Sequence, residues 1–96
     1  MIVVSVRAIM WMAEVLGGRE HTVVLSEGSS VADLLDALER RYGPGFAEAV
    51  YDPGTRETGS KAQVLVNGRN IAFLEGRRTR LADGDDVFFL SPVSGG

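Results

Sequence analysis

Hydrophobic residues alternate with other residues along the start of the chain. Every second position from residue 2 to residue 10 is apolar, and this period of two predicts a first strand over residues 2–12. Arg7 falls on the opposite face from the apolar set. Gly17-Gly18 predicts a turn, and residues 22–25 predict a second strand that is close enough in the chain for an antiparallel hairpin.

The hydrophobic spacing changes to that of a helix after residue 30. Apolar residues then recur three or four positions apart and form one stripe, which consists of Val31, Leu34, Leu35, Leu38 and Tyr42. Ser30 followed by Asp33 resembles a capping box, and Gly43-Pro44 predicts the helix end. We therefore expect one long helix over residues 31–42.

Shorter elements complete the predicted fold. Residues 46–51 and 73–76 favour helical turns, and residues 52–60 favour a loop. Residues 64–66 and 86–90 predict two further strands, residues 79–81 a short strand or extended segment, and Asn67-Gly68 a tight turn. This order predicts an α+β fold of the β-grasp type, a mixed sheet of four to five strands with one main helix packed on one face. The first and last strands should lie side by side and parallel at its centre.

The last predicted strand is apolar on both faces. If Val87 and Phe89 face the helix, alternation places Phe88 and Leu90 on the open side of the sheet. An uncovered apolar pair of this kind is typical of a docking surface for a partner. The alternative is that residues 44–61 fold over the pair and bury it.

Composition excludes several kinds of chemistry. The 96 residues suit one domain, and the absence of cysteine excludes a disulfide, a thiolate nucleophile, an iron–sulfur cluster and a cysteine-bound zinc. The one histidine, His21, lies in a strand-like stretch, which argues against a histidine metal site or a serine–histidine triad. We therefore expect no metal site.

Charge and hydropathy argue against nucleic-acid and membrane partners. The net charge is −3, and the basic group at residues 77–80 is offset by acidic neighbours, which favours a solvated turn or an acidic protein partner. No apolar run approaches the roughly 20 residues of a membrane span. The first sixteen residues carry Arg7 and Glu14 and lack a basic start, so they indicate a strand, not a signal peptide, and predict a cytoplasmic location.

A diglycine, Gly95-Gly96, follows the last predicted strand. We expect residues 1–90 to form the β-grasp domain and residues 91–96 to form a flexible tail. Glycine has no Cβ, so both residues fit a slot too narrow for other side chains. The ionised carboxylate of Gly96 can attack an activated phosphate to give an acyl-adenylate. The alternative is a frayed end without a role.

Several motifs of residues 64–96 occur together in one known family. They are Val66-Asn67-Gly68, Leu81-Ala82-Asp83-Gly84-Asp85-Asp86-Val87 and Pro92-Val93-Ser94-Gly95-Gly96. With the β-grasp order, the chain resembles the ubiquitin-like sulfur carriers of the MoaD/ThiS superfamily, and most of all the MoaD-like small subunit of molybdopterin synthase. The thiamine-pathway (ThiS-like) carriers share the diglycine and the Asp-Gly-Asp turn but lack the long middle segment. Ser91 is a departure, since relatives often have a second proline there.

The resemblance implies a carrier that is not an enzyme on its own. A ubiquitin-activating-like adenylyltransferase (MoeB-like) would use ATP to adenylate Gly96, and a sulfurtransferase would convert this group to a thiocarboxylate. The loaded tail would then enter the large subunit of molybdopterin synthase (MoaE-like) and donate sulfur to a pyranopterin precursor of the molybdenum or tungsten cofactor. No stably bound cofactor is expected, and the absence of cysteine fits sulfur carried on the main chain.

The partner surface and three alternative functions complete these expectations. The expected contact residues are Phe88, Leu90, Pro92, Val93, Arg69 and Arg80, and simple solvation explains the two arginines equally well. A ubiquitin-like modifier would instead pass the activated Gly96 to a lysine of another protein. A thiamine-pathway-type carrier would use the same thiocarboxylate, whereas in a plain β-grasp binding module the diglycine would be accidental.

Overall fold

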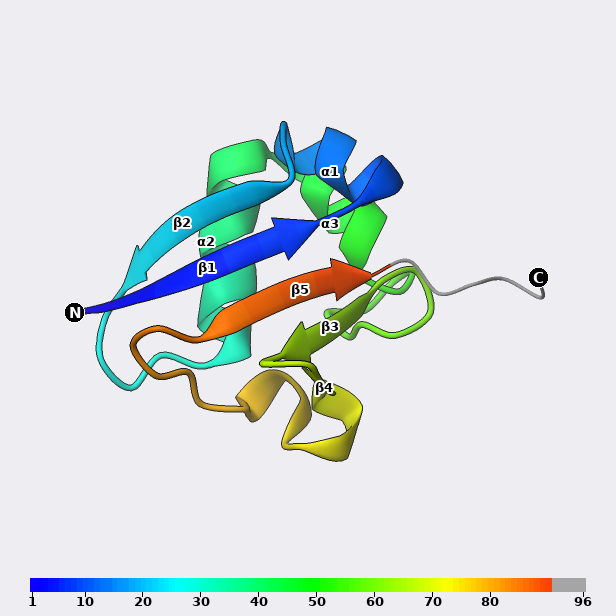
Figure 1. Ribbon diagram of the computed structural model, residues 1–96. Coiled ribbons are helices and arrows are strands. Elements are labelled where there is room, and N and C mark those ends of the chain that lie inside the picture. The colour runs from blue at the N-terminus through cyan, green and yellow to red at the C-terminus, as the bar shows by residue number, and fades with distance from the viewer. Residues whose placement is uncertain (91–96) are drawn as a thin grey trace.

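The computed structural model describes residues 1–90, so the predicted tail at residues 91–96 lies outside the described residues. Figure 1 shows a twisted sheet with the helices packed behind it. The strands are β1 (Ile2–Ala8), β2 (Glu20–Leu25), β3 (Gln63–Val66), β4 (Arg69–Asn70) and β5 (Asp86–Leu90). The helices are α1 (Met10–Leu16), α2 (Val31–Tyr42) and α3 (Pro44–Val50), and two short 3₁₀ turns are η1 (Ile71–Phe73) and η2 (Gly76–Arg78).

The five strands form one mixed sheet in the order β2-β1-β5-β3-β4. The first and last strands, β1 and β5, run parallel at the centre, with Val6 beside Val87, while β1 pairs with β2, and β3 with both β5 and β4, in antiparallel fashion. This arrangement confirms the predicted α+β fold of the β-grasp type. It also sets β5 between two strands, so that its position is fixed from both sides.

Helix α2 forms the second layer because its apolar stripe matches the inner face of the sheet. Val31, Leu34, Leu35 and Leu38 are buried, as the spacing predicts. The capping box is present, since the Ser30 backbone N–H donates to the Asp33 carboxylate at 2.9 Å and the Ser30 hydroxyl accepts from the Asp33 N–H at 3.4 Å. Gly43, with φ 81°, ends α2 immediately before α3 begins at Pro44.

The first strand is shorter than the sequence predicts. It ends at Ala8, and residues 10–16 form α1, so the prediction of a strand over residues 2–12 is wrong beyond Ala8. Met10 is 74% exposed, whereas Met12 and Leu16 are buried one helical turn apart. The apolar period therefore changes from two to nearly four inside a continuous hydrophobic run, which conceals the boundary.

The short strand predicted at residues 79–81 is also absent from the sheet. Thr79 O accepts from Val31 N–H at 2.9 Å, and Leu81 N–H donates to Ser29 O at 2.9 Å, so this segment is bonded to the residues at the start of α2. The edge strand is instead β4, which pairs with β3 through the predicted Asn67-Gly68 turn, where φ is 52° and 85°.

Residues 44–61 lie on the helix side of the sheet and leave the other face open. The Phe46 ring of α3 packs edge-on against the Phe89 ring at 6.0 Å between centroids. Farther along, Arg56 bonds to Asp36 at 3.0 Å and Glu39 at 2.8 Å on α2. The alternative in which this segment covers the outer face of β5 is therefore wrong.

Candidate functional site

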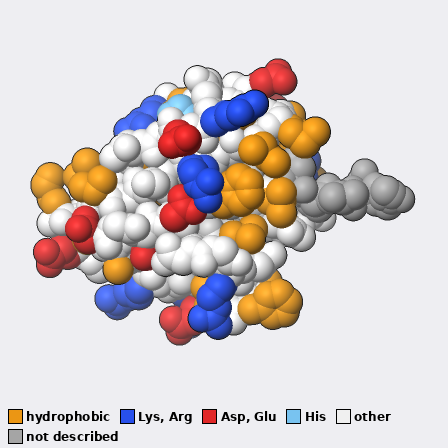
Figure 2. Space-filling model, in the orientation of Figure 1, with side chains coloured by type: hydrophobic (Ala, Val, Ile, Leu, Met, Phe, Trp, Pro, Cys, Tyr) orange, Lys and Arg blue, Asp and Glu red, His pale blue; other side chains and the backbone are white. Residues whose placement is uncertain are grey.

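The outer face of β5 forms an apolar surface on the side of the sheet that no helix covers. Val87 and Phe89 are fully buried beneath α2 and α3, while Phe88 and Leu90 are half-buried and point the other way. In register, Phe88 lies between Arg7 of β1 and Leu65 of β3. Figure 2 shows hydrophobic side chains gathered on this face near the C-terminal end of β5. We call Phe88, Leu90 and Leu65, together with Arg7, the open-face patch.

A fixed cation lies within the open-face patch. The Arg7 guanidinium donates two hydrogen bonds to the Asp86 carboxylate, from Nε and Nη2, each at 2.8 Å. It also lies over the Phe88 ring, 5.4 Å from the centroid. The hydrogen bond from Arg7 is the main reason that the pKa of Asp86 is held below its ordinary value. The patch therefore combines an aromatic ring with a guanidinium whose orientation is set before any partner arrives.

The acidic loop before β5 fixes where that strand begins. Asp83 accepts a hydrogen bond from the Val3 N–H of β1 at 2.7 Å, and the Gly84 N–H donates to Val3 O at 2.8 Å. Asp85 accepts from the Asn67 side-chain amide at 3.0 Å, which ties the loop to the β3–β4 turn. These carboxylates are used within the fold, so the Asp-Gly-Asp motif sets the register of β5 and thereby the direction in which Phe88 and Leu90 point.

The residues predicted for the partner surface do not all lie together. Phe88 and Leu90 share the open face. Arg69 is exposed on β4 opposite the buried Val66, so its side chain belongs to the helix side of the sheet edge. Arg80 is exposed beside Ser30 at the start of α2. The predicted site residues Pro92, Val93, Gly95 and Gly96 lie outside the described residues.

Sequence reasoning missed Arg7 as a member of the open-face patch. The alternation of β1 already placed it on the outer face, but that pattern says nothing of the neighbour it meets across the sheet. The parallel register of β1 and β5 aligns Arg7 with Phe88, although the two residues are far apart in sequence. A prediction of the strand pairing with its register could have found the contact.

The sequence matches the model of a known protein family. The model, described as ThiS family, matches residues 9–96. The chain belongs to the ThiS family. This match confirms the resemblance to the ubiquitin-like sulfur carriers of the MoaD/ThiS superfamily, and its range includes β5 and the diglycine.

Three relatives show the range of roles reported around this ThiS-family chain. Small archaeal modifier protein 3 of Haloferax volcanii is 36% identical over 83 residues, which cover 86% of this chain and 87% of the relative. Sulfur carrier protein CysO of Mycobacterium tuberculosis is 31% identical over 81 residues, covering 83% and 84% of the two chains. A solved structure from Pyrococcus furiosus, described as "Putative molybdopterin converting factor, subunit 1", superposes with a TM-score of 0.78 at 29% identity, covering 97% of this chain and 100% of that one.

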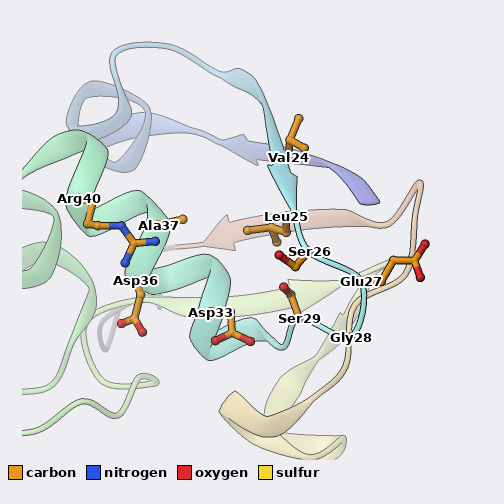
Figure 3. A pocket seen from close by; sticks show the side chains of 10 residues that line it. All are labelled: Val24, Leu25, Ser26, Glu27, Gly28, Ser29, Asp33, Asp36, Ala37 and Arg40. Atoms are coloured by element: carbon orange, nitrogen blue, oxygen red, sulfur yellow. The ribbon is translucent and has the colours of Figure 1, made fainter. Parts of the chain in front are cut away.

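An open cleft also lies on the helix side of this ThiS-family domain. Its volume is about 490 Å³, and it lies between α2 and the loop that joins β2 to α2. Figure 3 shows Asp33, Asp36 and Arg40 projecting from one side of α2, while Glu27 points away from the cleft. The lining carries both signs of charge and lies on the layer opposite the open-face patch.

The described part of the chain shows neither a metal-binding cluster nor a membrane-spanning helix. Within residues 1–90, no three His, Asp or Glu side chains come together in a way that could hold a metal ion. Within the same range, none of the helices has the length and apolar character that crossing a bilayer requires.

Proposed function

We propose that this ThiS-family chain is a sulfur carrier that serves as the small subunit of a molybdopterin-synthase-type sulfurtransferase. The observation that carries the proposal is the open-face patch on β5, the strand that leads directly to the diglycine segment in the sequence. Family membership supports the carrier role, and the similarity to the Pyrococcus furiosus structure described as "Putative molybdopterin converting factor, subunit 1" supports the choice of pathway.

The proposed chemistry takes place at the carboxyl group of Gly96. A carboxylate oxygen attacks the α-phosphorus of ATP and releases pyrophosphate, which gives an acyl-adenylate. Sulfide equivalents delivered by a sulfurtransferase then replace AMP at the acyl carbon, so that one sulfur takes the place of one oxygen. Glycine leaves this carbon unhindered, and the chain has no cysteine on which sulfur could otherwise be carried.

The proposed partners act in sequence in the cytoplasm, where ATP is present. An adenylyltransferase first binds the domain through the open-face patch and activates Gly96. The thiocarboxylate form then binds a large subunit that holds a pyranopterin precursor, and sulfur passes to that precursor. Pro92 restricts the backbone at the base of the tail, which lowers the conformational entropy lost when residues 91–96 enter a partner.

Intact-mass measurement tests the carrier function directly. After incubation with ATP, the adenylyltransferase and a sulfur donor, the chain should gain the mass difference between one sulfur and one oxygen. Gly96→Ala should abolish the gain while leaving the circular dichroism spectrum and the unfolding curve unchanged. If the wild-type chain gains no mass, the carrier function is refuted, and if Gly96→Ala prevents folding, the diglycine has a structural role.

A second assay separates the possible acceptors. The purified thiocarboxylate form is mixed with the large subunit and the pyranopterin precursor, and sulfur incorporation into the pterin is measured. Transfer to the pterin supports the molybdopterin pathway. A parallel reaction offers a thiazole precursor in place of the pterin precursor. Transfer in that reaction alone would instead assign the chain to thiamine synthesis.

Protein modification is the second candidate function, and one observation favours it. The Haloferax volcanii relative at 36% identity is named a small archaeal modifier protein. In this function the activated Gly96 would be passed to a lysine amine on another protein. Isopeptide-linked conjugates that appear in cells with the wild-type chain and disappear when Gly95-Gly96 is removed would support it. Their absence, together with sulfur transfer to the pterin, would exclude it.

A further inference from the structure

A phenylalanine near the β4 edge of the sheet is held out in solvent. Phe73 is 85% exposed, more than any other large hydrophobic side chain of residues 1–90. Burial of a phenylalanine is worth about 1.5–3 kcal/mol, and this position gains almost none of it.

The exposure of Phe73 follows from a well-anchored turn. Ile71, two residues before it, is only 4% exposed, and Leu74, directly after it, packs against the core. Asn70 caps the turn by accepting the Ala72 N–H at 2.9 Å, and the Leu74 N–H donates to Ile71 O at 2.9 Å. With its neighbours on both sides anchored in this way, the turn η1 directs the Phe73 ring outward.

The 3₁₀ turn that follows this exposed ring carries two arginines. η2 packs next to η1 and carries Arg77 and Arg78. Arg77 Nε lies 3.4 Å from the Glu57 carboxylate, and Arg78 is exposed. Residues 67–80 contain four arginines and a single acidic residue, Glu75, in a chain whose net charge is −3. Residues 67–80 are therefore a basic segment of a protein that is acidic as a whole.

We propose that Phe73, Arg77 and Arg78 form a second docking surface, which binds the adenylyltransferase through an apolar pocket bordered by Asp or Glu side chains. We call these three residues the Phe73 surface. The inference rests on the proposed sulfur-carrier function. Exposed aromatic and arginine side chains are the types that most often dominate binding energy at interfaces, and opposite charge on the partner speeds association.

The adenylyltransferase is the partner that most needs such a surface. It acts on the unmodified chain, whose carboxylate resembles every other carboxylate, so it must select this chain by contacts with the folded domain. Later partners can recognise the thiocarboxylate itself. The position also fits, because only β3 separates β4 from β5, and one partner that spans the open-face patch can therefore reach Phe73.

Steady-state kinetics of ATP–pyrophosphate exchange test the proposal. The purified adenylyltransferase is assayed with ATP, labelled pyrophosphate and increasing concentrations of the full chain. Phe73→Ser and the double variant Arg77→Glu/Arg78→Glu should each raise the KM for the chain by about ten-fold and leave kcat within about two-fold. Added salt should raise the KM of the wild type and affect the double variant less.

A matched control comes from the other layer of the molecule. Arg40 and Arg41 are also adjacent and exposed, and they lie in the last turn of α2, so Arg40→Glu/Arg41→Glu makes the same charge change away from the Phe73 surface. This control should keep the wild-type KM. Circular dichroism verifies that each variant is folded, which is expected because these side chains are exposed or, for Arg77, half-buried at the surface.

The possible outcomes distinguish failure of the Phe73 surface from failure of the sulfur-carrier function. If the wild-type chain supports no exchange, both the carrier function and the Phe73 surface are refuted. If the wild type supports exchange but Phe73→Ser and Arg77→Glu/Arg78→Glu keep its KM, only the Phe73 surface is refuted. An equal rise of KM in the Arg40→Glu/Arg41→Glu control would show a general charge effect and would also refute the local surface.

Discussion

Alanine substitution of two neighbouring residues of β5 should have opposite consequences: one variant should lose stability, and the other should lose affinity for the adenylyltransferase. Phe89 is completely buried and packs edge-on against Phe46 at 6.0 Å, while Phe88 is half-buried on the open face. Phe89→Ala should therefore damage the fold. Phe88→Ala should leave the fold largely intact and weaken the interaction with the adenylyltransferase.

The magnitudes follow from burial. Replacing a fully buried phenylalanine by alanine costs about 3–5 kcal/mol, because it removes the transfer free energy and leaves a cavity. Half-burial of Phe88 makes its loss worth about 1 kcal/mol, and the contact with the Arg7 guanidinium adds about 0.5 kcal/mol. The two variants should therefore differ by about 2–3 kcal/mol, out of a total free energy of unfolding of about 5–14 kcal/mol for a chain of this length.

Urea unfolding followed by circular dichroism measures the difference. With an m-value of about 1.5 kcal/mol per molar urea, the midpoint should fall by about 2–3 M in Phe89→Ala and by about 1 M in Phe88→Ala. Pyrophosphate exchange should show a raised KM for Phe88→Ala under conditions where that variant is fully folded. Equal losses of stability in the two variants would refute the assignment of these side chains to opposite faces of β5.

Three further predictions concern local features of the fold. Arg7 holds the pKa of Asp86 low, so the ion pair stabilises the fold above about pH 4 and loses this effect as the pH falls through the folded-state pKa of Asp86. Asp86→Asn should therefore lower the free energy of unfolding by less than about 1 kcal/mol at neutral pH. In urea titrations at several pH values, the variant should also lose this pH dependence of stability. Ser30→Ala removes the cap of α2 and should lower the free energy of unfolding by about 1 kcal/mol in thermal melts. Gly68→Ala should cost about 1 kcal/mol in the same melts because φ is 85° there, whereas Gly45→Ala, at a position in α3 with no positive φ, should not destabilise.

The main helix and the two faces of β5 could be predicted because their signals are local. The stripe of α2 and its capping residues lie within one stretch of sequence, and the structure places them as expected. Alternation in β5 likewise assigned Val87 and Phe89 to the core and Phe88 and Leu90 to the other side. Each of these inferences needs only the period of the element and one choice of buried face.

The elements that were predicted wrongly depend on contacts distant in sequence. α1 follows β1 within one hydrophobic run, and only the burial of Met12 and Leu16 against the rest of the core distinguishes helix from strand. Residues 79–81 have a strand-like composition, but their backbone groups bond to residues just before and at the start of α2. Local propensity cannot decide such cases because tertiary contacts override it.

The same distinction applies to the candidate site. Phe88 and Leu90 were found from alternation, but the contact of Arg7 with Phe88 requires the register of a parallel pair. Phe73 fell within a predicted turn, and nothing in that stretch of sequence says whether its ring is buried. Its exposure follows from Ile71 and Leu74 occupying the available places against the core.

Within the last third of the chain, strand β5 contributes both to the core and to the open-face patch. The carboxylates of Asp83 and Asp85 are bonded to β1 and to the β3–β4 turn, so they fix the start of β5. Once that start is fixed, alternation commits Val87 and Phe89 to the core and leaves the intervening positions for a partner. Under the proposed function, stability and recognition are thus assigned to alternate residues of β5, and substitutions on its outer face should change partner binding without unfolding the domain.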